Sequence, residues 1–185
     1  YEPLLENVGR MSPFVRSEED DRGVHRRPKR RHFKFFYHSV YAQREDYVLL
    51  DIIEEEHHFP EIVNRIIQTP FLAVERNVEV HVPTIDCLIG DKMTAFAPDT
   101  VGVPLNPRSS MQVVKQVFDI GELFNRITNI EMVKKTYAAI FAAENGYRNN
   151  AFSSVQALED TIDTAATICR LHLRGAPFDD RSELI

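Results

Sequence analysis

The sequence predicts an α+β fold, with strands concentrated in the first half of the chain and helices in the second. Two short runs, HFKFFY at 32–37 and YVLLDII at 47–53, are rich in aromatic and β-branched residues and predict strands. From residue 84 onward, apolar residues recur every three or four positions, which predicts amphipathic helices. Separate blocks of strands and helices are typical of α+β proteins.

The rest of the first half is less regular. The first 31 residues are interrupted by Pro and Gly and predict irregular structure. The residues between the two aromatic runs suit a hairpin loop. Pro60 and the apolar residues after it predict a short helix at 60–68. Strands are expected at 71–74 and at 78–82, where VEVHV alternates between apolar and polar residues.

Four helices are predicted in the second half. Thr84 is a candidate N-cap for a helix that runs to about residue 97. Further helices are expected at 111–127, 131–144 and 153–173. The last carries a continuous apolar stripe: Val155, Leu158, Ile162, Ala165, Ala166, Cys169 and Leu173. This pattern divides the chain into a strand-rich part, 1–82, and a helical domain, 83–185.

Composition excludes several protein classes. The chain has 185 residues, 43% hydrophobic and 27% charged, as in ordinary soluble globular proteins. No apolar run approaches the roughly 18–20 residues that cross a bilayer, so no membrane association is expected. The cysteines, Cys87 and Cys169, are too far apart in sequence for a disulfide framework or a metal knuckle. A reducing, cytoplasmic compartment is therefore expected.

The charge distribution indicates a polyanionic partner. The net charge is −6, yet residues 22–34 hold seven of the 22 Lys and Arg residues and no acidic residue. Aromatic residues end this basic run, a combination that suits RNA or nucleotide contact. The alternative is a solvated loop leading into a core strand. The candidate nucleotide- or RNA-binding residues are Arg26, Arg27, Lys29, Arg30 and Arg31.

Three charged residues lie within apolar patterns. Asp51 interrupts an apolar strand, where a carboxylate must be paired, bound to a cation or turned to solvent by strand alternation. Lys92 lies on the apolar stripe of its helix, so its ammonium either extends to the helix edge or faces an anion. Asp119 either serves a site or pairs with Lys115, one turn earlier.

Other motifs carry little information. The cluster EEEHHFP at 54–60 offers carboxylates and imidazoles, but neighbouring side chains in a loop rarely converge on one metal, and a solvated strand end is the simpler interpretation. The sequence contains no phosphate-binding loop, dinucleotide-binding Gly pattern, CxxC, HExxH or GxSxG.

The order of three segments resembles the AbiEii/AbiGii toxin family of nucleotidyltransferase-like proteins. YVLLDII is similar to the family strand that presents an acid, and HVPTIDCLIGDKMTAFAP to its helix with a central lysine. KQVFDIGELF is similar to its helix with a basic residue four positions before an aspartate. The resemblance covers about residues 31–125 and implies a nucleotidyltransferase-like mixed sheet followed by a C-terminal helical bundle.

The resemblance implies roles for the three charged residues. The catalytic candidates are Asp51, Lys92 and Asp119. The resemblance also implies that Asp51 is a ligand of Mg²⁺ and that the substrate is an NTP. The family also carries an upstream Gly-Ser turn and an Asp-x-Asp pair on a strand, and neither is found here. SEEDD at 17–21 is acidic but lies in no predicted strand.

Three functional hypotheses follow. The first is the toxin of a bacterial toxin–antitoxin or abortive-infection phage-defence system, which transfers a nucleotide from an NTP to tRNA, another RNA or another acceptor and is controlled by a cognate antitoxin. The second is a nucleotidyltransferase-fold module without catalysis that binds RNA or a protein partner. The third is a structural or regulatory helical protein.

Overall fold

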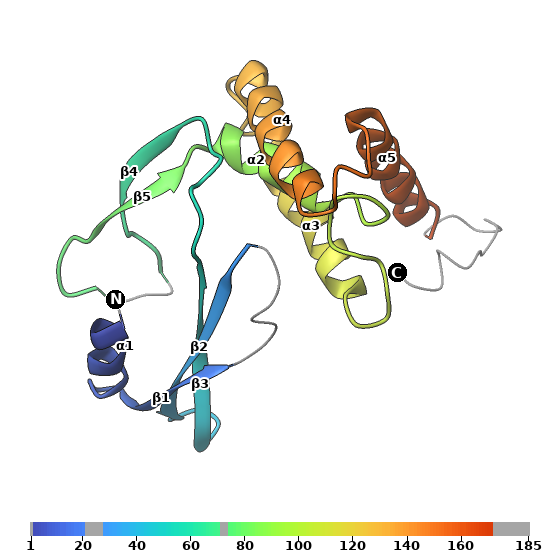
Figure 1. Cartoon of the computed structure of the whole chain (residues 1–185). Helices are drawn as coiled ribbons and strands as arrows, with labels where there is room; N and C mark the ends of the chain where they lie inside the picture. The colour runs from blue at the N-terminus through green and yellow to red at the C-terminus, as the bar shows by residue number, and fades with distance from the viewer. Residues whose placement is uncertain (1, 21–27, 71–73, 172–185) are drawn as a thin grey trace. The chain divides into compact units, whose positions relative to one another are not determined.

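The computed structural model describes residues 2–20, 28–70 and 74–171. The chain forms two compact units, 1–57 and 58–185, and each is described by itself. Strands lie in the first half and helices predominate in the second, which confirms the predicted α+β class (Figure 1). The strands described pair antiparallel in two sheets, where the family resemblance implied a mixed sheet.

The first unit contains one helix and a three-stranded sheet of order β1-β2-β3. Its elements are α1 (Glu2–Gly9), β1 (Phe14–Asp20), β2 (Arg30–Ser39) and β3 (Arg44–Ile53). β2 and β3 form the predicted hairpin, with Phe33 opposite Leu50. The aromatic rings of Phe33 and Phe35 are buried and form the core of this unit. β2 lies between β1 and β3, where its aromatic side chains can pack against cross-strand neighbours on both sides.

The prediction of irregular structure for residues 1–31 is wrong at two places. Residues 2–9 form α1, and residues 14–20 form β1. Seven residues with only two apolar side chains, FVRSEED, form a strand because β2 offers a register in which Glu19 lies opposite Phe33. Pairing with β2, which is distant in sequence, therefore determines a strand conformation that the local amino-acid composition does not favour.

The second unit begins with a two-stranded sheet. β4 (Ile62–Ile66) pairs antiparallel with β5 (Glu79–Pro83), with Asn64 opposite His81. The helix predicted at 60–68 is therefore wrong: its β-branched residues suit a strand, and β5 supplies the partner. β5 itself matches the predicted strand at 78–82, while residues 71–73 of the strand predicted at 71–74 lie outside the described residues.

Four helices follow, and the sequence predicts all of them. They are α2 (Ile85–Ala95), α3 (Ser110–Phe124), α4 (Ile130–Gly146) and α5 (Ser154–Arg170). Thr84 caps α2 as expected, with its side chain accepting a hydrogen bond from the backbone N–H of Cys87. α2 packs against both α3 and α4. No helix in the described part of the chain is both long and apolar enough to cross a bilayer.

α2 and α4 approach each other closely at Gly90. A Cβ atom at this position would lie 2.7 Å from Cβ of Thr136 and 2.8 Å from the carbonyl oxygen of Val133. At the N-terminal end of α2, the buried carboxylate of Asp86 accepts hydrogen bonds from the backbone N–H and the hydroxyl of Thr128, at 2.9 and 2.7 Å. These contacts fix α2 against the segment that leads into α4.

α5 exposes the large apolar residues of its predicted stripe, Val155, Leu158 and Ile162, while Ala165 and Ala166 are half-buried and Leu173 lies outside the described residues. Val155 and Ile162 are 60% and 65% exposed, whereas the buried face of the helix carries Ala157, Asp160, Thr164 and Thr167. Asp160 accepts hydrogen bonds from the backbone N–H of Asp99 and the hydroxyl of Thr100. α5 is therefore attached to the rest of the unit through polar contacts and small side chains.

Candidate functional site

A group of charged and polar side chains joins α2 to α3. Nζ of Lys92, from α2, lies 3.0 Å from Oδ2 of Asp119 and 3.2 Å from Oε1 of Gln116, both from α3. The same oxygen of Asp119 lies 2.8 Å from Nζ of Lys115, one helical turn earlier. Lys92, Lys115, Gln116 and Asp119 are called the lysine cluster below. The structure thus brings together two of the three predicted catalytic residues, Lys92 and Asp119.

The helical periods explain this arrangement. Lys115 and Gln116 lie four and three positions before Asp119 on α3, so each lies beside Asp119 on the helix surface. Lys92 lies on the side of α2 that meets this surface. Of the alternatives considered for Lys92, the structure supports contact with an anion, because its ammonium reaches Asp119 and its side chain is 25% exposed. The alternative pairing of Asp119 with Lys115 is present as well.

The four residues of the cluster together carry one net positive charge, since two ammonium groups share a single carboxylate; Asp91, the neighbour of Lys92 in sequence, is not included in this count. The hydrogen bond from Lys115, together with that from Lys92, holds the pKa of the Asp119 carboxyl below its usual value, although partial burial opposes this. Asp119 is therefore ionised at neutral pH. Lys115 is 62% exposed, so its ammonium remains accessible to a ligand.

Asp91, which precedes Lys92, is a charged residue that the sequence reasoning did not select. Burial raises the pKa of its carboxyl; Lys92 opposes this shift and Glu144 of α4 reinforces it. A perturbed carboxyl beside a lysine cluster is typical of functional sites. The signal in the sequence was the pair of adjacent charges in GDK, within a helix whose other charged residue is Asp86.

Asp51 belongs to the first unit and lies on β3. Its side chain is 63% exposed, and its Oδ1 lies 2.7 Å from Nδ1 of His32 on the neighbouring strand β2. His32 and Asp51 are directly opposite in the β2–β3 register. The solvent-facing position agrees with strand alternation, the simpler of the two interpretations of this residue. The structure groups Asp51 with His32, and its catalytic role stays a prediction.

A family model described as "Nucleotidyl transferase AbiEii toxin, Type IV TA system" matches residues 6–180. The chain belongs to the AbiEii family. No curated protein and no solved structure matches it. Membership confirms the resemblance found in the sequence and supports a nucleotidyltransferase-like toxin role. It also implies an NTP as substrate and an antitoxin as partner.

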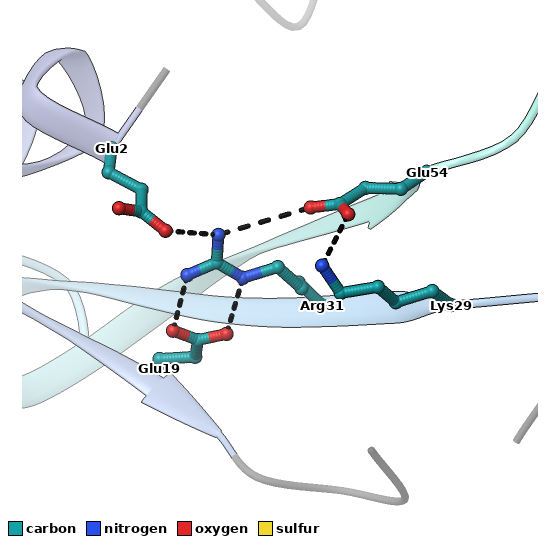
Figure 2. A network of polar contacts seen from close by, with 5 residues as sticks. All are labelled: Glu2, Glu19, Lys29, Arg31 and Glu54. Carbon is teal, nitrogen blue, oxygen red and sulfur yellow. Dashed lines mark hydrogen bonds and ion pairs between the residues drawn. The ribbon is translucent and has the colours of Figure 1, made fainter. Parts of the chain in front are cut away.

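The basic run of this AbiEii chain is largely engaged by carboxylates where it is described (Figure 2). Arg31 forms a bidentate pair with Glu19, at 2.6 Å for both contacts, and reaches Glu2 at 2.7 Å. Lys29 pairs with Glu54 at 2.6 Å. Arg31 is only 17% exposed, so binding of RNA by this side chain would require displacement of its carboxylates.

The other residues of the basic run differ in their surroundings. Arg30 is exposed on β2, while Arg26 and Arg27 lie outside the described residues. RNA or nucleotide binding by Arg26, Arg27 and Arg30 therefore stays a prediction. For Lys29 and Arg31, the contacts of Figure 2 show a structural use that joins α1, β1 and the end of β3 to β2.

Nucleotidyltransferases usually employ a divalent cation, and the AbiEii family implies one here. Within residues 2–20, 28–70 and 74–171, no group of three or more His, Cys, Asp and Glu side chains is placed to hold a metal. Asp51, the predicted Mg²⁺ ligand, offers a single carboxylate that already contacts His32. The described residues do not fit a complete metal site. Residues 17–20 do lie in a strand, β1, contrary to the sequence-based expectation for SEEDD.

Proposed function

We propose that this AbiEii protein is a nucleotidyltransferase that transfers a nucleotide from an NTP to an RNA or other acceptor, and that the lysine cluster binds the phosphates of the NTP. The observation that carries this proposal is the sharing of one Asp119 oxygen by the ammonium groups of Lys92 and Lys115. Two lysines held by one carboxylate keep a net positive charge on a partly exposed surface, and this charge suits a polyphosphate.

The chemistry of the transfer gives the two lysines a defined task. Attack of an acceptor hydroxyl on the α-phosphorus breaks the bond to the pyrophosphate, on which negative charge accumulates. Ammonium groups that are already in place stabilise this charge without reorganisation during the reaction. Asp119 positions both lysines. The proton of the attacking hydroxyl passes to a carboxylate or to water, and Asp51, on the first unit, is the candidate carboxylate that the family resemblance gives.

The wider biological proposal follows from the family. The acceptor is RNA, with tRNA as one candidate, and the protein acts in the cytoplasm as the toxin of a phage-defence system under the control of its antitoxin. Support comes from the family description and from the basic run at residues 22–34.

The test measures transfer and phosphate binding separately. The full chain is incubated with each of four α-³²P-labelled NTPs, Mg²⁺ and total bacterial RNA, and label in RNA and in protein is counted. Binding of sodium tripolyphosphate is measured by calorimetry. The variants Lys92→Met and Lys115→Met should each lower both signals about tenfold or more. Lys135→Met, an exposed position on α4, serves as the matched control and should leave both unchanged.

Each outcome selects among the hypotheses. Labelling that depends on Lys92, Lys115 and Asp51 supports the enzyme. Salt-sensitive RNA binding without any label transfer supports the non-catalytic module instead. Wild-type levels of tripolyphosphate binding in both lysine variants would show that the cluster is a structural ion pair and not the phosphate site.

A further inference from the structure

Gln116 is a neutral side chain within the otherwise charged lysine cluster. The residue is 9% exposed, and its Oε1 accepts a hydrogen bond from Nζ of Lys92 at 3.2 Å. Asp119 accepts from the same nitrogen at 3.0 Å from the next turn of α3. Two acceptors three residues apart on one helix face therefore fix the ammonium of Lys92.

The neutrality of Gln116 decides the charge of the cluster. An amide oxygen accepts a hydrogen bond as a carboxylate does, but it brings no formal charge. A carboxylate at this position would give two carboxylates to two lysines and a net charge of zero, as in an ordinary surface ion-pair group. With Gln116, Lys92 is held in place and one positive charge remains unneutralised.

We propose that Gln116 is a positioning residue that fixes the Lys92 ammonium while preserving the net positive charge with which the cluster binds a polyphosphate. This inference rests on the proposed function, because it takes the lysine cluster as the phosphate site. It adds a specific requirement at residue 116: an acceptor of hydrogen bonds without a negative charge.

The requirement separates a positioning role from a merely structural one. Gln116→Glu is nearly isosteric and converts the hydrogen bond to Lys92 into an ion pair, so the folded state should keep its thermal stability or gain some. The same change neutralises the cluster and should weaken tripolyphosphate binding about tenfold, as expected for one added unit charge near a partly exposed site. A structural role alone would predict that stability and binding change together.

The experiment uses the full chain and sodium tripolyphosphate as the probe. Affinity is measured by calorimetry and thermal unfolding by circular dichroism for wild type, Gln116→Glu and Gln116→Leu. Asn149→Asp, at an exposed position in the loop after α4, makes the same change from amide to carboxylate away from the cluster and is the matched control. We expect about a tenfold loss for Gln116→Glu, about threefold for Gln116→Leu, which removes only the acceptor, and less than twofold for Asn149→Asp.

Several results would overturn the inference. Wild-type affinity in Gln116→Glu, or equal losses in Gln116→Glu and Asn149→Asp, would show that residue 116 has no specific role. If Gln116→Glu fails to fold, wild-type affinity in Gln116→Leu would also refute positioning. If Lys92→Met and Lys115→Met lose binding while the Gln116 variants do not, the proposed function stands and only this inference fails. Absence of binding by wild type, or wild-type affinity in both lysine variants, overturns the phosphate-site proposal and the inference with it.

Discussion

Replacement of Asp86 by Asn tests how the N-terminal end of α2 is held. The Asp86 carboxylate is buried and accepts hydrogen bonds from the backbone N–H of Thr128 at 2.9 Å and from its hydroxyl at 2.7 Å. Asn keeps one carbonyl oxygen but places an amide group where the second oxygen accepted from the hydroxyl. One charge-assisted hydrogen bond therefore becomes neutral, and the other is lost or reversed.

The size of the effect follows from these two bonds. Hydrogen bonds to charged groups contribute about 1.5–3 kcal/mol and neutral ones about 0.5–1.5 kcal/mol, so the bond that becomes neutral loses about 1 kcal/mol. The second bond loses about 1 kcal/mol when it is reversed and about 1.5–3 kcal/mol when it is lost. Asp86 also lies in the first turn of α2, where a negative charge contributes about 0.3–1 kcal/mol. The free energy of unfolding should fall by about 2–4 kcal/mol, or about 1–2 M in the urea midpoint.

The pH dependence provides a second measurement. Burial opposes ionisation of Asp86, but the hydrogen bonds from Thr128 and from the backbone of Asn129 outweigh it and lower the pKa of the carboxyl. Because the folded-state pKa is depressed, this stabilisation is present above the unfolded pKa, about 3.9, and is lost as the pH falls through the folded value. The difference between wild type and Asp86→Asn should therefore be largest at neutral pH and shrink below about pH 4.

The assay is urea unfolding followed by the helical circular dichroism signal at pH 7, 5, 4 and 3. Asp163→Asn, at an exposed position on α5, is the control and should change the free energy by less than about 0.5 kcal/mol. A midpoint shift for Asp86→Asn no larger than that of Asp163→Asn, or an unchanged difference at pH 3, would refute the reasoning.

Three further substitutions test the packing of the second unit by the same unfolding assay. Gly90→Ala places a Cβ atom 2.7 Å from that of Thr136 and should lower the free energy of unfolding by about 1–3 kcal/mol. Its control is Gly121→Ala on α3, where a Cβ atom would have no atom within 4 Å, and this change should be neutral or stabilising. Equal effects of the two substitutions would contradict the close approach at Gly90. The buried hydroxyl of Tyr137 has no hydrogen-bond partner among the described residues. Tyr137→Phe should therefore raise the free energy of unfolding by up to about 1 kcal/mol, and a clear loss of stability would contradict this. Ser153→Ala removes the hydrogen bond that the Ser153 hydroxyl accepts from the backbone N–H of Gln156, the N-cap of α5, and should cost about 1 kcal/mol. Ser154→Ala is its control.

Apart from α1, which was missed, the sequence predicted the helices of the described residues better than their strands. The 3.6-residue period and the Thr84 cap identified α2, α3, α4 and α5 because helices are stabilised by contacts close in sequence. β1 and β4 were missed because each depends on a partner strand: β1 on β2, and β4 on β5. The orientation of α5 was not predictable either, since periodicity defines an apolar stripe but not what covers it.

The same distinction applies to the candidate site. Lys92 was selected because it lies on the apolar stripe of its helix, and Asp119 because it lies mid-helix at the border of an apolar face; the structure places the two side chains 3.0 Å apart. Gln116 was not selected because a neutral amide in a helix is common, and Asp91 because it is one more charged residue in a helix. The hydrogen bond of Gln116 to Lys92 and the burial of Asp91 follow only from the packing of α2 against α3 and α4. Arg31 was selected for its charge, but its carboxylate partners come from positions 12 to 29 residues away.

The close approach at Gly90 has a consequence for the movement of α2. Residues 90 and 92 project about 200° apart around the helix, so the backbone contact with α4 lies nearly opposite the lysine that reaches α3. A helix in backbone contact on one side has little freedom to roll or slide, and any rotation would carry the ammonium of Lys92 with it. Since a displacement of 1 Å at a reacting group can cost about a hundredfold in rate, the missing side chain at residue 90 limits the amplitude of motion at residue 92.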